Sequence, residues 1–143
     1  MIKKTLVFLF AFCLICALAT GCTDQTAPKS AGQVDLDLTE LSVTLVAAEV
    51  NNMKIHPDDY MGKTVKIDGL YIALDDDGDG IFSHYLIVDQ CCLRLEFVWN
   101  GDHTYPDDYP NPNTELQMTG VYKKYEEAGQ ARYCLSVDDF TVL

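Results

Sequence analysis

The chain has 143 residues and a formal net charge of −12. This length suits one domain of ordinary size. The charge argues against nucleic acid as a partner, because phosphate binding needs clustered Lys and Arg, and against an electrostatic attraction to anionic lipid. An acidic surface suits cations or basic peptides, and its simplest interpretation is solubility.

The first twenty-two residues have the pattern of a secretory signal. Lys3 and Lys4 precede an apolar run over residues 6–19, which ends in small residues before Cys22. As a helix this run would span about 21 Å at 1.5 Å per residue, less than the roughly 30 Å of a hydrocarbon core. The run is therefore too short for a comfortable transmembrane helix.

The end of this segment, Ala19-Thr20-Gly21-Cys22, resembles the lipobox of bacterial lipoproteins. The resemblance implies cleavage before Cys22, with a covalent diacylglycerol on its thiol and acylation of its new amino group. We therefore expect a signal peptide over residues 1–21 and a protein anchored to the cell membrane, facing outside the cytoplasm. Removal of Lys3 and Lys4 would leave residues 22–143 with a net charge of −14. The alternative is an ordinary secreted protein.

Residues 22–37 are polar and contain Pro, Gly, Ser and Ala, which is typical of a flexible tether. Its r.m.s. reach of roughly 20 Å would hold a domain over residues 38–143 just clear of the bilayer. The next apolar residues recur at helical spacing, which predicts a helix that begins near Thr39 or Ser42 and ends before Pro57. The positions expected on its apolar face are Leu41, Leu45, Val46, Val50 and Met53.

From residue 64 onward short runs alternate apolar and polar residues, which predicts β-strands. Turns over residues 75–80 and at Gly129, and a Pro-rich loop over residues 100–113, separate them. Gly69 and Gly120 lie inside two of the runs and predict bends or bulges. The five expected strands cover residues 64–72, 84–88, 93–99, 115–125 and 132–143.

This order of elements predicts a mainly β fold with one N-terminal helix, an OB-like five-stranded small barrel. The pattern G-K-x-V-x-I-x-G over residues 62–69 resembles the start of many OB-fold domains. Such a resemblance concerns the fold and says little about function. The alternative is a small α+β sandwich.

The turn over residues 75–80 reads D-D-D-G-D-G, and Asp75, Asp77 and Asp79 match the first ligands of an EF-hand calcium loop. Leu86 stands where that loop needs a bidentate Glu, and the flanking segments look like strands, so this is not an EF-hand. The two interpretations are a weak calcium turn and a plain hairpin turn, and we favour the plain turn.

Three cysteines remain once Cys22 and the signal are set aside: Cys91, Cys92 and Cys134. Outside the cytoplasm an odd number indicates one disulfide with a leftover thiol, three thiols, or a shared metal. Our first expectation is a disulfide from Cys134 to one of the adjacent pair. The alternatives are buried thiols, and a thiolate metal site with His84 or Asp89 as a further ligand.

The segment G-D-H-T-Y-P-D-D-Y-P over residues 101–110 gathers acidic and aromatic side chains in one loop stiffened by prolines. Such a loop is either a binding surface or a cover for the open end of the barrel with its tyrosines packed down. The segment over residues 56–60 has similar chemistry and is a further candidate for the same surface. The candidate binding residues are Asp102, His103, Tyr105, Asp107, Asp108 and Tyr109.

Several of these motifs together resemble small lipoproteins of Gram-positive anaerobes whose function is uncharacterised. The motifs are H-P-D-D-Y, G-K, the Cys-Cys pair, E-F, the 101–110 segment and T-G, over residues 56–60, 62–63, 91–92, 96–97, 101–110 and 119–120. The resemblance implies the extracytoplasmic location and the single domain. It implies no activity.

These observations lead us to expect a monomeric, non-enzymatic module that binds an unknown protein or small molecule outside the membrane. The alternative is a lipoprotein that handles zinc through the cysteines or calcium through the 75–80 turn. A hydrolase is the weakest hypothesis, because no nucleophile–base pair or phosphate-binding loop can be named.

Overall fold

The structure is a computed structural model that describes residues 32–76, 78–89 and 92–143. The predicted signal peptide, the lipidation site Cys22, and Asp77 and Cys91 lie outside the described residues, so the expectations that rest on them stay predictions. The elements in chain order are β1 (Leu36–Asp37), α2 (Val43–Ile55), η2 (Pro57–Asp59), β2 (Thr64–Leu74), β3 (Ser83–Ile87), β4 (Arg94–Trp99), β5 (Glu115–Glu127) and β6 (Gln130–Val142).

Strand pairing joins the five long strands in a ring. β2 pairs antiparallel with β3 through residues 70–74 and with β5 through residues 64–70. β4 pairs antiparallel with β3 and parallel with β6, and β6 pairs antiparallel with β5. The pairings thus run from β2 through β3, β4, β6 and β5 back to β2. The predicted fold class, mainly β with one N-terminal helix and an OB-like arrangement of five strands, is confirmed.

The helix buries a narrower face than its sequence indicated. Val46, Val50 and Met53 are buried at spacings of four and three residues, whereas Leu41 and Leu45 are 39% and 55% exposed. Placing these two leucines on the core face was wrong. Neither predicted cap works as expected: Ser42 holds the N-cap position without a side-chain hydrogen bond, and the side chain of Thr39 bonds Asp37 instead.

The end of the predicted tether belongs to the folded part. Leu36 and Asp37 form β1, which pairs in parallel with Val65 and Lys66 of β2. The next residue, Leu38, is 1% exposed. The tether therefore ends before β1 and not at residue 37. A two-residue strand leaves too short an alternation to be recognised in a polar sequence.

Two glycines permit close approaches between strands. A Cβ at Gly69 would lie 2.8 Å from the carbonyl oxygen of Ile87, and one at Gly120 would lie 2.6 Å from Cγ1 of Val137. The β5–β6 register shifts between Met118 and Gly120, as a β-bulge does. The predicted irregularity at Gly120 is confirmed, whereas the β2–β5 pairing runs through Gly69 without a shift.

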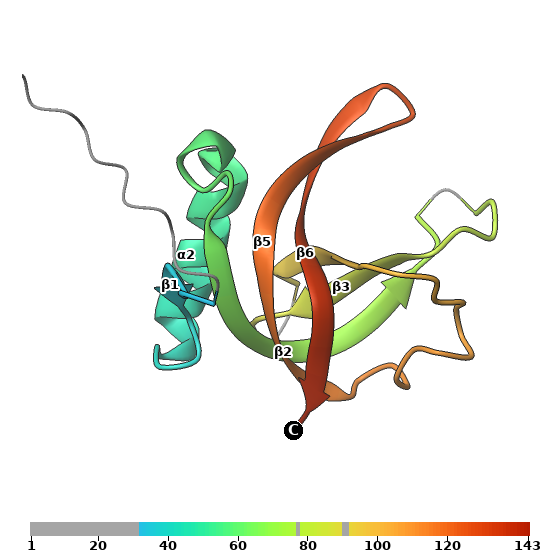
Figure 1. Cartoon of the computed structure of the whole chain (residues 1–143), viewed down its shortest axis with the longest axis horizontal. Helices are drawn as coiled ribbons and strands as arrows, with labels where there is room; N and C mark the ends of the chain where they lie inside the picture. Colours follow the sequence, from blue (N-terminus) through green and yellow to red (C-terminus); the bar gives the residue numbers. More distant parts are fainter. Residues whose placement is uncertain (1–31, 77, 90–91) are drawn as a thin grey trace, which may run out of the picture. The chain divides into compact units, whose positions relative to one another are not determined.

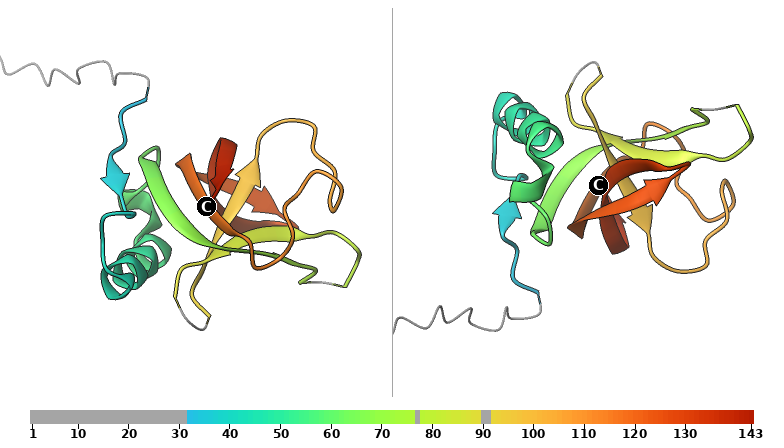
Figure 2. Two further views of the ribbon diagram at one scale, coloured as in Figure 1. Left: turned by 90° about the horizontal axis from the view of Figure 1, so that it is seen from below. Right: turned by 90° about the horizontal axis from the view of Figure 1, so that it is seen from above.

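The β2–β3 turn and the 100–113 loop lie on the side of the fold away from α2. Figure 1 shows α2 and β1 at one side, and the β2–β3 turn and the 100–113 loop at the opposite side, with the tip of the β5–β6 hairpin curling above them. The two views in Figure 2 show the same separation. The apolar core fills the space between, with contributions from α2 and from each long strand. The loop end is thus where a binding surface can form without disturbing the helix.

Candidate functional site

The aromatic residues of the 101–110 loop pack down onto the sheet. The Tyr109 ring stacks on His84 with centroids 4.0 Å apart and 13° between planes. His103 stacks on Trp99 at 3.5 Å and 9°, and Tyr105 lies 4.6 Å from Phe82. This packing matches the second interpretation of the loop, a cover for the end of the barrel.

The carboxylates of the same loop face solvent. Asp102, Asp107 and Asp108 are exposed. Asp108 also fixes the loop, because its Oδ2 accepts the Thr104 N–H at 2.7 Å while its own N–H donates to the Thr104 carbonyl at 2.9 Å. The loop therefore presents an acidic outer surface held by aromatic packing beneath.

His84 serves as a neutral ring within this cluster. Its Nδ1 lies 2.9 Å from the hydroxyl of Tyr71, and burial lowers the pKa of its imidazole to about 4. Burial likewise raises the pKa values of Tyr71 and Tyr109. All three side chains are therefore uncharged near neutral pH, which suits stacking in an apolar environment.

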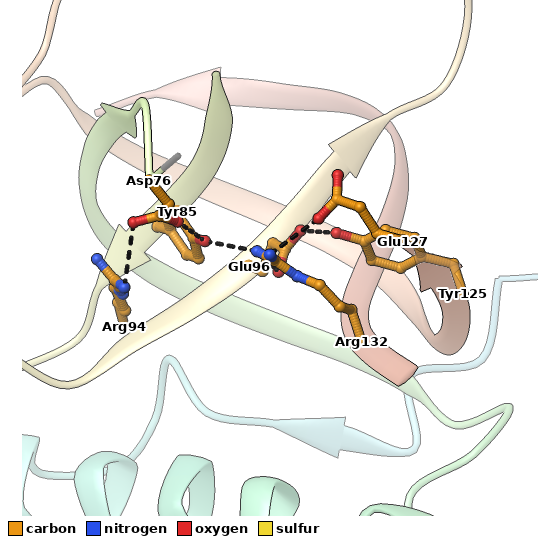
Figure 3. Close-up of polar contacts among 7 residues, drawn as sticks. All are labelled: Asp76, Tyr85, Arg94, Glu96, Tyr125, Glu127 and Arg132. Carbon is orange, nitrogen blue, oxygen red and sulfur yellow. Dashed lines mark hydrogen bonds and ion pairs between the residues drawn. The ribbon is translucent and has the colours of Figure 1, made fainter. Parts of the chain in front are cut away.

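A charged network lies on the other face of β3 and β4, as Figure 3 shows. Its centre is Glu96, whose residue is 9% exposed. The Glu96 carboxylate lies 3.1 Å from a guanidinium nitrogen of Arg132 and accepts the hydroxyl hydrogen of Tyr125. Arg132 also pairs with Glu127 at 2.8 Å. One guanidinium thus compensates two carboxylates, which leaves a net negative charge at this point.

Tyr85 links the same network to the β2–β3 turn. Its hydroxyl accepts a hydrogen bond from Arg132 at 2.8 Å and donates one to Asp76 at 2.8 Å. Asp76 also pairs with Arg94 at 3.6 Å, and the Arg94 guanidinium lies 4.5 Å from the centre of the Tyr85 ring. These contacts tie the turn and β4 to the part of the β5–β6 hairpin near its tip.

A groove of about 290 Å³ is lined by residues from both faces of β3 and β4. We call it the loop groove. No Lys or Arg is among the described residues that line it. Its walls combine aromatic rings with the two carboxylates of the network, and include Phe82, His84, Trp99, Tyr109, Glu96 and Glu127. A smaller cavity of about 140 Å³, which also contains Glu127, is lined by Asp76 and Asp79.

The 75–80 turn uses its carboxylates for its own backbone. Asp75 accepts the N–H groups of Asp79 and Gly80, each at 3.1 Å, and Asp79 accepts the N–H of Ile81 at 2.9 Å. This is the chemistry of a plain hairpin turn, the interpretation favoured from the sequence. The third candidate calcium ligand, Asp77, lies outside the described residues.

Cys92 and Cys134 are not joined by a disulfide. Cys134 is buried on β6 opposite Lys123 of β5, and burial raises the pKa of its thiol to about 11. It is therefore an uncharged, apolar side chain at neutral pH and not a nucleophile. A disulfide to Cys91 stays a prediction, because that residue lies outside the described part.

The residues considered as further metal ligands have other partners. His84 Nδ1 contacts Tyr71, and Asp89 Oδ1 accepts the N–H groups of Cys92 and Leu93, each at 2.8 Å. Within the described ranges no three His, Cys, Asp or Glu side chains gather closely enough to hold a metal ion. A separate question is whether a helix could span a membrane. Among the described residues, no helix is long and apolar enough to do so.

The sequence indicated the loop but missed most of the groove. Glu96 and Arg132 fall in strands predicted from alternation alone, and Phe82 falls outside every predicted strand. The only available signal was a charge at Glu96 between two apolar strand residues. His56 and the acidic residues of η2 follow directly after α2, and the structure does not bring them into the loop groove.

No protein-family model matches the chain, and no curated protein matches it.

Proposed function

We propose that the protein is a lipid-anchored module outside the cytoplasm that binds a ligand or partner protein at the loop groove and catalyses no reaction. The observation that carries this proposal is the groove itself, a concave surface of about 290 Å³ that combines stacked aromatic rings with buried carboxylate. Binding sites are commonly concave, largely preformed and lined by aromatic side chains with a few polar groups.

The anchor rests on the sequence. Two lysines, a short apolar run and Cys22 after small residues resemble a lipoprotein signal. The resemblance of several motifs to small Gram-positive lipoproteins supports the same extracytoplasmic, membrane-anchored location. With so acidic a chain, acyl groups rather than basic side chains would hold it at the bilayer.

The charge of the loop end favours a cationic or basic ligand. Glu96 and Glu127 share one guanidinium, and Asp102, Asp107 and Asp108 are exposed nearby in the same loop system. A basic peptide would gain long-range attraction from these carboxylates, and its rate of association would fall as salt is added. Nucleic acid would be repelled.

The anchor is tested with Cys22→Ala in the native cell type. We expect the variant to leave the membrane fraction and to lose labelling by a fatty-acid probe. A variant that stays in the membrane fraction would contradict the lipid anchor.

The groove is tested by NMR titration with a hexapeptide that contains five lysines and one tryptophan, and with the matching glutamate peptide. We expect the lysine peptide alone to shift the signals of Trp99 and Tyr109, and binding to weaken with salt. The double variant Asp102→Asn/Asp107→Asn should weaken binding severalfold. The matched control Asp58→Asn/Asp59→Asn removes the same charge from η2 and should have no effect. Equal binding of both peptides, or none, would count against the proposal.

The alternative function, metal handling, gains no supporting observation in the part of the chain that the structure describes.

A further inference from the structure

A second groove, of about 260 Å³, is lined by none of the residues of the loop groove. It lies between the segment that enters α2, the middle of β2 and the end of β3. We call it the gap groove. Its walls combine apolar residues with Thr39 and three acidic residues, Asp68, Asp89 and Glu115. The apolar residues that matter here are Leu41, Val43, Leu70 and Ile87.

The gap groove lies where one edge of β2 lacks a neighbouring strand. β1 pairs with Val65 and Lys66, and β3 pairs with residues 70–74. Residues 67–69 lie between these two stretches and pair with β5 alone, on the opposite edge. On the edge of β2 that faces β1 and β3, residues 67–69 thus have no neighbouring strand.

The backbone groups of Asp68 face this interruption. The Lys66 carbonyl accepts the Leu38 N–H at 2.8 Å, on the β1 side, whereas the Tyr71 N–H donates to Thr114 at 2.9 Å, on the β5 side. Backbone groups alternate between the two edges of a strand, so those of Asp68 share the side of Lys66. An extended segment lying in the gap groove would find them in a position to pair.

The Asp68 side chain supplies the second, independent feature. Its Oδ1 is buried and has no hydrogen-bond partner. The ion pairs formed among the described residues include neither Asp68 nor Glu115. A buried carboxylate oxygen without a donor is unfavourable and uncommon in native proteins. Because the protein covers this oxygen, an external donor reaches it only when the Asp68 side chain turns into the groove, and the gain of a donor favours that turn.

We propose that the gap groove binds a short extended segment of a partner polypeptide that carries a lysine or arginine beside an apolar residue. On binding, the Asp68 side chain would turn to expose Oδ1 to the cationic group, which would also lie near Glu115. The apolar neighbour would cover Leu41 and Leu70, and the segment's backbone would pair with that of Asp68. This is strand addition limited to one or two residues. The stretch of β2 that lacks a neighbouring strand beside this groove favours a chain segment over a small molecule.

The test uses the full chain in detergent micelles and two tripeptides, acetyl-Val-Lys-Val-amide and acetyl-Val-Gln-Val-amide. In amide NMR spectra we expect the lysine peptide to shift the signals of Asp68, Gly69 and Leu70, and the glutamine peptide to bind at least tenfold more weakly, as loss of a charged hydrogen bond predicts. Equal affinity for the two peptides would overturn the proposal.

Variants separate binding from folding. Asp68→Asn should weaken the lysine peptide about tenfold while leaving the melting temperature unchanged or higher, because sites kept for binding are not optimised for stability. Glu115→Gln, at an exposed position, should cost about two- to threefold. Glu126→Gln, an exposed residue of the β5–β6 hairpin, is the matched control and should change nothing.

Unchanged affinity in Asp68→Asn would overturn the proposal. Loss of the Asp68 amide signal at high protein concentration without peptide would place a second copy of the chain in the groove, and would also overturn it. The Asp102→Asn/Asp107→Asn variant should bind the lysine tripeptide normally, so failure here and failure at the loop groove are distinguishable.

Discussion

His84 and Glu96 occupy opposite faces of the same pair of strands, and each is a titratable group removed from water. His84 pairs across β3 and β4 with Phe97 of the core, and Glu96 pairs with Tyr85 on the other face. Stacked rings surround His84, whose pKa of about 4 keeps it neutral. Glu96 is instead surrounded by Arg132 and Tyr125, which supply hydrogen bonds and opposite charge to the carboxylate.

The difference teaches how the loop groove obtains its mixed walls. A histidine can lose its charge at little cost near neutral pH, so an aromatic cluster can enclose it. A buried carboxylate needs donors, and the chain provides them by bending the β5–β6 hairpin over β4. The contribution of the aromatic wall to stability should therefore depend on pH and on the presence of each ring. The contribution of the charged wall should depend on each carboxylate keeping its cation.

The largest effect is expected from Arg132→Met. This change leaves Glu96 buried without its cation, and breaking such a pair costs about 3 kcal/mol when the burial is incomplete. Urea unfolding gives the loss of free energy from the midpoint at constant slope. The double variant Glu96→Met/Arg132→Met should recover much of it. If the double variant is no more stable than the single one, lost packing rather than stranded charge explains the effect.

Tyr109→Ala should cost about 2 kcal/mol, because it removes a half-buried ring that stacks on His84. It should also raise the pKa of His84 toward 6.5 by admitting water, which the imidazole signals report in a pH titration. Asp107→Ala, an exposed change in the same loop, is the control. A His84 pKa that stays low would show that the core beneath, and not the loop, excludes water.

The third effect is a pH dependence of stability. The folded-state pKa of His84 lies below its unfolded value of about 6.5, so its contribution is full above pH 6.5 and is lost as pH falls toward 4. We expect a loss of about 1–2 kcal/mol by pH 5, after allowance for partial exposure. Phe at position 84 cannot take up this proton, so unfolding curves of His84→Phe should lack this part of the dependence. Identical pH profiles would exclude His84 as its source.

The smallest effect is expected at the edge of the charged wall. Arg94→Met removes a half-exposed ion pair with Asp76 at 3.6 Å and a cation over the Tyr85 ring. Such exposed contacts contribute under about 1 kcal/mol. Thermal unfolding should show a shift of at most a few degrees that shrinks in high salt. A loss as large as that of Arg132→Met would mean that the network acts as one unit.

Local patterns predicted the strands well because each long strand alternates apolar and polar residues, and Gly120 marked the bulge in β5. They failed at β1, whose two residues are too few to show a period, and at Leu45, which has helical spacing but faces solvent. The 101–110 loop was recognised from composition. Its partners Phe82, His84 and Trp99 were not, because stacking across the loop joins residues distant in sequence.

The residues alone determined the fold class, the turn chemistry of Asp75 and Asp79 and the composition of the loop, because each depends on neighbours along the chain. Tertiary structure decided which polar groups lose water. Pairing of β4 with β6 and the bend of the β5–β6 hairpin bring Arg132 onto Glu96, and the gap between β1 and β3 leaves Asp68 Oδ1 without a donor. Both depend on strand register over long separations, which no local period encodes.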